Sequence, residues 1–212
     1  MSIRRFFHRD VPIAALAGAV ALTALPVAAQ DDGLYPEPSA PDASFLRVYA
    51  PEGDRVTIGD RSYVPGESGL TSYVEIAPGE VPVEVGDSET VIEAGPNLHY
   101  SLLEPGEGAP ATDAITNSPA QGDLVFYNLT ELEGVDLYVP SAEAAAVSGV
   151  GPMSGAGVAL NAPLTLTFEV RHEDETLAVV EDVEMRRGGG TTVLFAGEPG
   201  DHTATAEANT YE

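Results

Sequence analysis

The amino-acid sequence predicts an all-β protein that consists of two tandem small antiparallel β-sandwich domains. Short runs of alternating apolar and polar residues recur along the chain, about eight to twelve residues apart. No stretch of about twelve residues or more keeps the hydrophobic period of a helix. A segment rich in proline and glycine divides these runs into two groups, which favours two domains over one.

The first 29 residues have the features of a secretory signal peptide. Arg4, Arg5 and Arg9 form a basic start, residues 11–27 are mostly apolar, and small residues end the segment at Ala29. The apolar stretch is too short for a comfortable membrane span, although a buried helix or a membrane anchor is the alternative interpretation. Cleavage near Ala29 predicts a secreted protein that does not itself span the membrane.

An acidic segment with several prolines follows at 30–43 and predicts an extended arm. Strand patterns then define a first domain at 44–104, beginning with Leu46 and Val48 in alternation with polar or aromatic residues. Within this domain Pro82 lies inside an apolar run. Because proline cannot donate to a sheet ladder, it predicts an edge strand or a bulge.

Residues 105–122 contain proline and glycine but few large apolar side chains, and predict a linker. A second domain is expected at 123–212, with a Gly-rich and loose stretch at 149–157. Its opening, D-L-V-F-Y-N from Asp123, resembles S-F-L-R-V-Y-A from Ser44, and both predict the start of a β-hairpin. The repetition favours tandem domains, while one large sandwich with similar hairpins is the alternative.

The charge of the chain limits its partners. It has nine arginines, no lysine and 34 acidic residues, and removal of the signal leaves 6 arginines against 33 acids, a formal net charge of −27. Nucleic acid is therefore excluded, because phosphate binding needs clustered cations. The acids are spread along the chain, as expected for solubility in a salty environment. The absence of cysteine excludes disulfides and Cys-ligated zinc.

One short motif suggests catalysis. Gly86-Asp87-Ser88 matches the start of the nucleophile block in esterases and acetyltransferases with a Ser/His/Asp triad. That family places its acid and histidine as D-x-x-H. The histidines after the signal are His99, His172 and His202, and none of them has an aspartate three residues earlier. The motif lies between two strand patterns, where a hairpin turn is expected. We predict no catalytic residue, no cofactor and no enzyme activity.

Two other motifs suggest ligands but match no known site. His172 with the acids at 173–175 offers cation ligands, yet their spacing fits no EF-hand and is typical of a solvated hairpin tip. The glycines at 188–190 lack the Lys-Ser/Thr of a phosphate-binding loop. No metal site is predicted.

Arg47 is one of the few cations and shares a strand face with Phe45 and Tyr49. An arginine between aromatic residues can clamp a carboxylate of a partner, and the alternative is a salt bridge within the domain. The tyrosines Tyr49, Tyr63, Tyr73 and Tyr138 also leave open the stacking of a sugar ring, although a tyrosine on a strand more often packs against its neighbours.

Several motifs together carry a family resemblance. They are L-Y at Leu34, the Pro/Ser/Ala arm with S-F-L-R-V-Y from Ser44, A-P-G at Ala77, V-G-D-S around Gly86, H-Y-S-L from His99, N-L-T at Asn128 and R-G-G-G-T-T-V-L-F from Arg187. In these motifs the chain resembles the alginate O-acetylation accessory protein (AlgF) family over most of its length after the signal. It departs from the family in its extreme acidity and its lack of lysine.

The resemblance implies a non-catalytic periplasmic adaptor of two β-sandwich domains, needed for O-acetylation of an alginate-type exopolysaccharide. Its expected partners are the periplasmic and membrane-associated O-acetyltransferase proteins of that pathway, and the polysaccharide itself is a further candidate. Arg47, Tyr49 and Tyr35 are the candidate binding residues. The alternatives are a polysaccharide-binding module, an acetyltransferase or esterase in its own right, and a salt-adapted secreted protein without a polysaccharide role.

Overall fold

The computed structural model describes residues 38–212, which form one compact unit. The predicted signal peptide, most of the arm and Tyr35 lie outside the described residues. Residues 38–43 precede the first strand, and the amide of Ala40 donates a hydrogen bond to Glu75. The side-chain hydrogen bond of Ser39, followed by this backbone contact, holds the pKa of the Glu75 carboxyl below its ordinary value.

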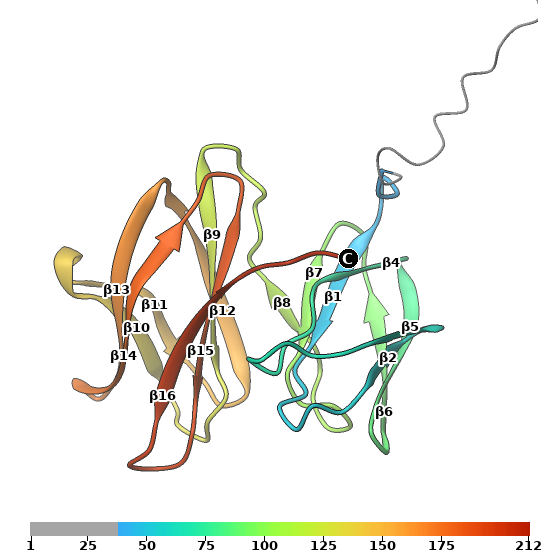
Figure 1. Ribbon diagram of the computed structural model, residues 1–212, viewed down its shortest axis with the longest axis horizontal. Helices are drawn as coiled ribbons and strands as arrows, with labels where there is room; N and C mark the ends of the chain where they lie inside the picture. The colour runs from blue at the N-terminus through green and yellow to red at the C-terminus, as the bar shows by residue number, and fades with distance from the viewer. Residues whose placement is uncertain (1–37) are drawn as a thin grey trace, which may run out of the picture. The chain divides into compact units, whose positions relative to one another are not determined.

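The first sandwich consists of two four-stranded sheets, with the strand orders β4-β1-β7-β8 and β3-β2-β5-β6 (Figure 1). Its strands are β1 (Ser44–Val48), β2 (Val56–Ile58), β3 (Arg61–Tyr63), β4 (Val74–Ile76), β5 (Gly79–Val85), β6 (Ser88–Ala94), β7 (His99–Leu102) and β8 (Ala111–Asp113). The strand β8 lies inside the segment 105–122 and pairs with β7, so part of that segment completes a sheet.

The second sandwich also has two four-stranded sheets, with the orders β12-β9-β15-β16 and β11-β10-β13-β14. Its elements are β9 (Gln121–Asn128), β10 (Val135–Val139), the 3-10 helix η1 (Pro140–Ala142), β11 (Ala144–Val150), β12 (Ser154–Asn161), β13 (Leu164–His172), β14 (Glu175–Met185), β15 (Gly190–Ala196) and β16 (Thr203–Ala208). The all-β class and the two tandem sandwiches are therefore confirmed.

The two sandwiches have the same topology. Counted from its own first strand, each has the sheet orders 4-1-7-8 and 3-2-5-6. In each, the first and seventh strands pair in parallel, β1 with β7 and β9 with β15, while the other neighbours pair antiparallel. Each of the two sheets that contain these pairs therefore has one parallel pair among antiparallel ones, and the sandwiches are predominantly antiparallel, as the sequence predicts.

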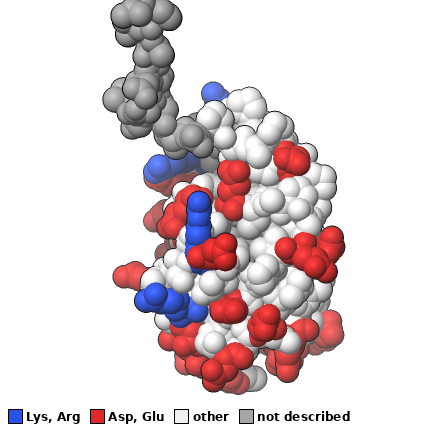
Figure 2. Space-filling model, turned by 90° about the vertical axis from the view of Figure 1, so that its right-hand side faces the viewer, with Lys and Arg blue, Asp and Glu red and all other residues white. Residues whose placement is uncertain are grey.

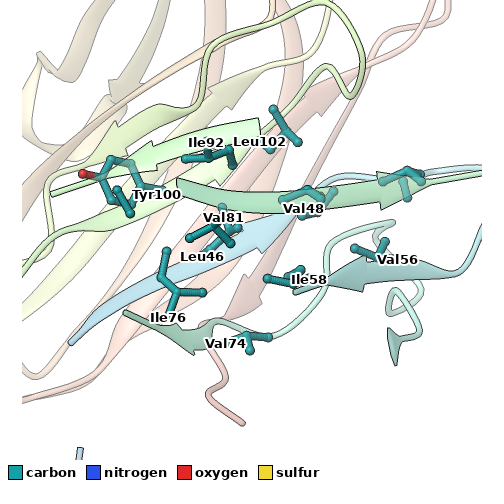
Figure 3. Close-up of a cluster of buried hydrophobic side chains, with 14 residues drawn as sticks. Leu46, Val48, Val56, Ile58, Val74, Ile76, Val81, Ile92, Tyr100 and Leu102 are labelled. Carbon is teal, nitrogen blue, oxygen red and sulfur yellow. The ribbon is translucent and has the colours of Figure 1, made fainter. Parts of the chain in front are cut away.

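The matching openings of the two halves are not hairpins. β1 and β2 belong to different sheets, and so do β9 and β10, so each opening crosses from one layer of its sandwich to the other. The hairpin prediction was wrong because both strands direct their apolar residues into one core from opposite sides. Leu46 of β1 and Ile58 of β2 lie in the same buried cluster (Figure 3).

Each sandwich has its own hydrophobic core. The core of the first is mostly aliphatic, with Leu46, Val48, Ile92 and Leu102 almost fully buried. The core of the second also contains aromatic side chains, including Phe126, Phe168 and Phe195. Burial of one such side chain stabilises a fold by about 1.5–3 kcal/mol relative to its exposed state, so each core supports its own sandwich.

Pro82 occupies an interior strand, in contrast to the edge strand or bulge that the sequence predicts. Its strand β5 lies between β2 and β6, and Pro82 faces Val91 of β6. The missing N–H causes no conflict, because β2 is only three residues long and ends at Ile58. Beyond that end, Gly59 turns away with a φ of 59° and donates its own N–H to the Pro82 carbonyl.

Candidate functional site: a buried polar joint between the sandwiches

The sheet β4-β1-β7-β8 of the first sandwich faces the sheet β12-β9-β15-β16 of the second. A third apolar cluster joins Leu70 and Leu103 of the first to Val125, Tyr127 and Leu194 of the second. The central strands are therefore buried on both faces, as the nearly continuous burial of β9 demonstrates. We call this contact region the joint.

Arg47 lies at the centre of the joint with only 2% of its surface exposed. Its Nε donates to Ser101 Oγ at 2.9 Å within the first sandwich. Its Nη2 donates to Tyr127 Oη at 2.6 Å and to Thr192 Oγ1 at 2.8 Å, both in the second. Its Nη1 lies 3.3 Å from its acceptor, Asn209 Oδ1. One side chain thus bonds both sandwiches.

Two aromatic rings enclose the same guanidinium. Arg47 Cζ lies 4.3 Å from the centroid of the Tyr73 ring and 4.9 Å from that of Tyr127. Cation–π attraction of this kind is strongest where water is excluded, and both rings are fully buried. The guanidinium therefore has two aromatic contacts in addition to its hydrogen bonds.

The negative charge that balances Arg47 is Asp113 of β8, and two hydroxyl groups connect them. The Oη of Tyr127 accepts from Arg47 and donates to Asp113 Oδ1 at 2.5 Å. Ser101 Oγ likewise accepts from Arg47 and donates to Asp113 Oδ2 at 2.6 Å. Tyr73 Oη donates to the same Oδ2 at 2.7 Å. The carboxylate thus accepts three hydroxyl hydrogen bonds while buried, which compensates for its lost hydration.

Burial fixes the charge states of the joint. It raises the pKa of Tyr73 and of Tyr127, so both phenols stay protonated and available as donors. Burial alone lowers the pKa of Arg47, but Tyr127, Tyr73 and Asp113 outweigh it and the pKa is raised overall. Arg47 therefore stays a cation, and both phenols stay neutral.

Residues 209–212, which we call the strap, run from the second sandwich onto the first (Figure 1). The amide of Tyr73 donates to the carbonyl of Thr210, and the amide of Glu212 donates to the carbonyl of Tyr73. Ser72 Oγ lies 2.9 Å from Thr210 Oγ1. The strap thereby adds backbone pairing next to β4 and closes one side of the joint.

Tyr211 of the strap joins three aromatic side chains of the first sandwich, and we call these four rings the strap cluster. Tyr211 stacks on Tyr73 with centroids 5.2 Å apart and meets Phe45 edge-on at 5.4 Å. His99 stacks on Phe45 at 4.9 Å and lies edge-on to Tyr73 at 5.2 Å. Burial lowers the pKa of His99, although the nearby Asp113 and Asp123 oppose this shift. The neutral imidazole is therefore the form that fits this cluster.

This lowered pKa predicts that stability falls on acidification. A histidine whose folded pKa is below the ordinary value of 6.5 binds its proton more readily in the unfolded chain. Stability is then lost as the pH falls through about 6.5 toward the folded pKa. We expect His99→Phe, which keeps a ring in the cluster, to flatten the dependence of the unfolding free energy on pH between about 7.5 and 5.5.

Urea unfolding at several pH values measures this effect, and His202→Phe is the matched control because His202 lies outside the strap cluster, against Phe195. The lowered pKa of Glu75 acts below its ordinary value of 4.5 and does not enter this pH range. An unchanged slope in His99→Phe, or an equal change in both variants, contradicts the assignment.

The three predicted binding residues differ in their burial and in whether they lie in the described part of the chain. Arg47 is buried in the joint, and its donors are directed to groups of the same chain. Tyr49 is half-buried against the apolar cluster of the joint, and burial raises its pKa. Tyr35 lies outside the described residues. The role of the three residues in partner binding stays a prediction.

Sequence reasoning missed the partners of Arg47. Asp113 lies in the segment expected to be a linker, and Asn209 follows the last strand. One signal was available: D-L-V-F-Y-N is apolar on both strand faces, which is typical of a strand covered on both sides. That pattern indicates that Val125 and Tyr127 have a second layer to pack against.

The residues considered for catalysis and metal binding lie elsewhere. Ser88 begins β6 directly after the Gly86-Asp87 turn and pairs with Val85, as the hairpin interpretation predicts. In residues 38–212 no group of three potential metal ligands is close enough to hold an ion. Over the same residues, no helix combines the length and apolar character that a membrane crossing requires.

The chain was compared with protein families, curated proteins and solved structures. No protein-family model matches the chain, and no curated protein does. The C-terminal domain of AlgF from P. aeruginosa is 17% identical, with a TM-score of 0.38, and the match covers 42% of this chain and 98% of that one. The Bacillus anthracis TIE protein is 12% identical with a TM-score of 0.23, over 76% of this chain and 34% of that one.

Proposed function

We propose that this protein is a non-catalytic periplasmic adaptor required for O-acetylation of an alginate-type exopolysaccharide. It acts by holding acetyl-donor and acetyltransferase proteins of that pathway at a fixed separation. The resemblance of the motifs from Leu34 to Arg187 to the AlgF family supports the assignment to this O-acetylation pathway. The adaptor role is supported by the construction of the chain, in which two sandwiches of equal topology offer two docking modules.

The observation that carries the proposal is the joint. A flexible linker would let two docking modules move independently, whereas a buried Arg47 with partners in both sandwiches defines one relative orientation. Fixed orientation lowers the entropic cost of bringing two bound partners together. The joint itself is filled by side chains of the chain, so its role is to position the two modules.

The test is genetic and chemical. Deletion of the gene is expected to leave the exopolysaccharide in production but without its acetyl esters, which are measured by NMR of the purified polymer. A plasmid copy carrying Ser88→Ala is expected to restore acetylation fully, because the adaptor transfers no acetyl group. Loss of acetylation in Ser88→Ala, with normal protein level, favours the acetyltransferase or esterase alternative.

A second measurement addresses the partners. Affinity purification of the tagged protein from crosslinked cells is expected to recover an O-acetyltransferase of the pathway, identified by mass spectrometry. Polymer binding by the purified protein in physiological salt, without such a partner, favours the polysaccharide-binding module. Normal acetylation in the deletion strain rules out the adaptor role.

A further inference from the structure

The strand β6 is a free edge of the first sandwich. It is the last strand of the sheet β3-β2-β5-β6, and within residues 38–212 it pairs only with β5. The loop after β7 approaches one end of it through the Gly106 amide, which donates to the Thr90 hydroxyl and not to the backbone of β6. The backbone groups on the outer side of β6 are therefore available for pairing.

The register identifies which backbone groups these are. Pro82 of β5 has no N–H and directs its carbonyl toward Gly59, so the pair Pro82–Val91 exchanges no hydrogen bonds. By alternation, the N–H and C=O groups of Glu89, Val91 and Glu93 all point away from β5. Their side chains share the solvent face, where Val91 is 58% exposed. An extended segment that pairs with β6 would bond these three residues.

The side chains on this face form a defined pattern. Glu84 lies directly opposite Glu89, and Glu80 lies directly opposite Glu93, with Pro82 and Val91 between the two pairs. Like charges in directly opposed positions of a sheet repel each other. Among the described residues, none of the four glutamates has an ion pair or a side-chain hydrogen bond. The face thus presents uncompensated negative charge on both sides of an apolar centre.

Acidic side chains predominate around this face. Figure 2 shows the side of the molecule that lies on the right in Figure 1, and acidic side chains there greatly outnumber basic ones. Of the described arginines, Arg47 is buried, Arg171 and Arg186 pair with Glu169 and Glu184 of the second sandwich, and Arg187 donates to the Ala162 carbonyl. The first sandwich also has two exposed arginines, Arg55 and Arg61, and neither of them forms an ion pair with a glutamate of β5 or β6. A basic partner would therefore gain electrostatic attraction along the whole approach.

The same pattern argues against pairing with a second copy of this chain. Two β6 strands paired antiparallel about Val91 would set Glu89 opposite Glu93 at both ends. Charged residues on free edges commonly prevent such self-association. The glutamates therefore disfavour pairing with a second copy of the chain and favour pairing with a basic strand. The difference between these two affinities gives the edge its specificity.

We propose that β6 is a docking edge for an extended, basic segment of a partner protein, with Lys or Arg at positions i and i+4 and an aliphatic residue at i+2. Such a segment adds a fifth strand to the sheet by backbone pairing. Its basic side chains lie beside Glu89 and Glu93, and its aliphatic residue covers Val91. This surface deepens the adaptor role proposed above by naming the chemistry of one partner.

The test uses the full chain after the signal and two synthetic peptides. The probe is acetyl-Thr-Arg-Thr-Val-Thr-Arg-Thr-amide, whose arginines share a strand face with its valine. The control peptide, acetyl-Thr-Thr-Arg-Val-Arg-Thr-Thr-amide, has the same composition, but its arginines lie on the opposite face. NMR titration is expected to shift the amides of 89–93 and to give at least about fivefold tighter binding of the probe.

Two variants separate backbone pairing from charge. Val91→Pro removes an outward N–H that the β5–β6 ladder does not use, and we expect about tenfold weaker binding with the fold retained. The double variant Glu89→Gln, Glu93→Gln is expected to weaken peptide binding about fivefold. Its control, Glu131→Gln with Glu133→Gln, makes the same change of charge on the second sandwich and is expected to leave peptide binding unchanged. If Val91→Pro unfolds, the glutamine pair still decides the question.

Equal affinity of the two peptides, or shifts spread over the surface, indicates general attraction to an acidic protein and overturns the docking edge. Absence of saturable binding at millimolar peptide does the same. These measurements need no polysaccharide and no acetyl donor, so their failure leaves the adaptor test unaffected. Conversely, if the protein binds the probe but is dispensable for acetylation, the docking edge is supported and the proposed role in acetylation is ruled out.

Discussion

Replacement of Arg47 by methionine is expected to destabilise the protein by about 3–5 kcal/mol, the usual cost of removing one member of a buried charge pair. The substitution keeps a long apolar side chain but leaves Asp113 charged and buried without its counter-charge. It also leaves Tyr127, Ser101 and Thr192 without their shared donor. Urea unfolding followed by tyrosine fluorescence and circular dichroism measures the loss.

The control is Arg186→Met, which removes an exposed ion pair with Glu184 and is expected to cost about 0–1 kcal/mol. Adding Asp113→Asn to Arg47→Met removes the unbalanced charge and is expected to recover part of the stability. If the joint couples the sandwiches, Arg47→Met also separates their unfolding into two transitions. A loss below about 1 kcal/mol would show that the network contributes little to the fold.

Gly155→Ala is expected to destabilise the protein by about 3 kcal/mol, because it overpacks the joint from the side of β12. A Cβ atom at Gly155 would lie 2.3 Å from Cδ1 of Tyr127, far inside van der Waals contact. Movement of the Tyr127 ring would break the hydrogen bonds of its hydroxyl with Arg47 and Asp113. The absence of a side chain at this position is therefore a requirement of the joint.

The matched control is Gly151→Ala, four residues earlier, where the nearest atom to an added Cβ is a Glu133 carboxylate oxygen at 3.6 Å. This change is expected to stay within about 0.5 kcal/mol of the parent protein. Thermal unfolding monitored by circular dichroism compares the two variants. Equal midpoints for Gly155→Ala and the parent would mean that the Tyr127 ring has room to move.

Much of the fold follows from the period of the apolar residues. Alternation in the runs from Leu46, Leu164 and Thr192 predicts strands, and the absence of a helical period predicts an all-β protein. The similar openings at Ser44 and Asp123 predict a repeat, and the equal strand orders of the two sandwiches agree with it. These features are local, so sequence spacing is enough to predict them.

What the sequence could not predict depends on pairing between distant segments. Alternation is the same for a hairpin and for two strands in opposite sheets, so the crossing from β1 to β2 was missed. The stretch 149–157 was expected to be loose because of its glycines, yet Gly155 and Gly157 lie in β12, where close contacts with β9 exclude a side chain. Glycine content alone does not distinguish a flexible chain from a crowded one.

The candidate site had the same limit. The sequence identifies Arg47 as unusual because cations are rare and aromatic residues flank it. The structure places this arginine in the joint. The sequence does not reveal that a second sheet covers that strand face, and so the choice between a partner clamp and a salt bridge within the domain stayed open. Asp113 and Ser101 become its partners only through the pairing of β7 with β1 and β8.

The partners of Arg47 also have consequences for the order of folding. They lie 54 residues away at Ser101, 80 at Tyr127, 145 at Thr192 and 162 at Asn209. Closing such long loops is entropically costly, and a guanidinium that leaves water before its acceptors arrive loses its hydration without compensation. Each sandwich can form its own core earlier, from contacts within its half of the chain. We therefore expect docking of two preformed halves to be the last and slowest step, one that succeeds only when both are correctly folded.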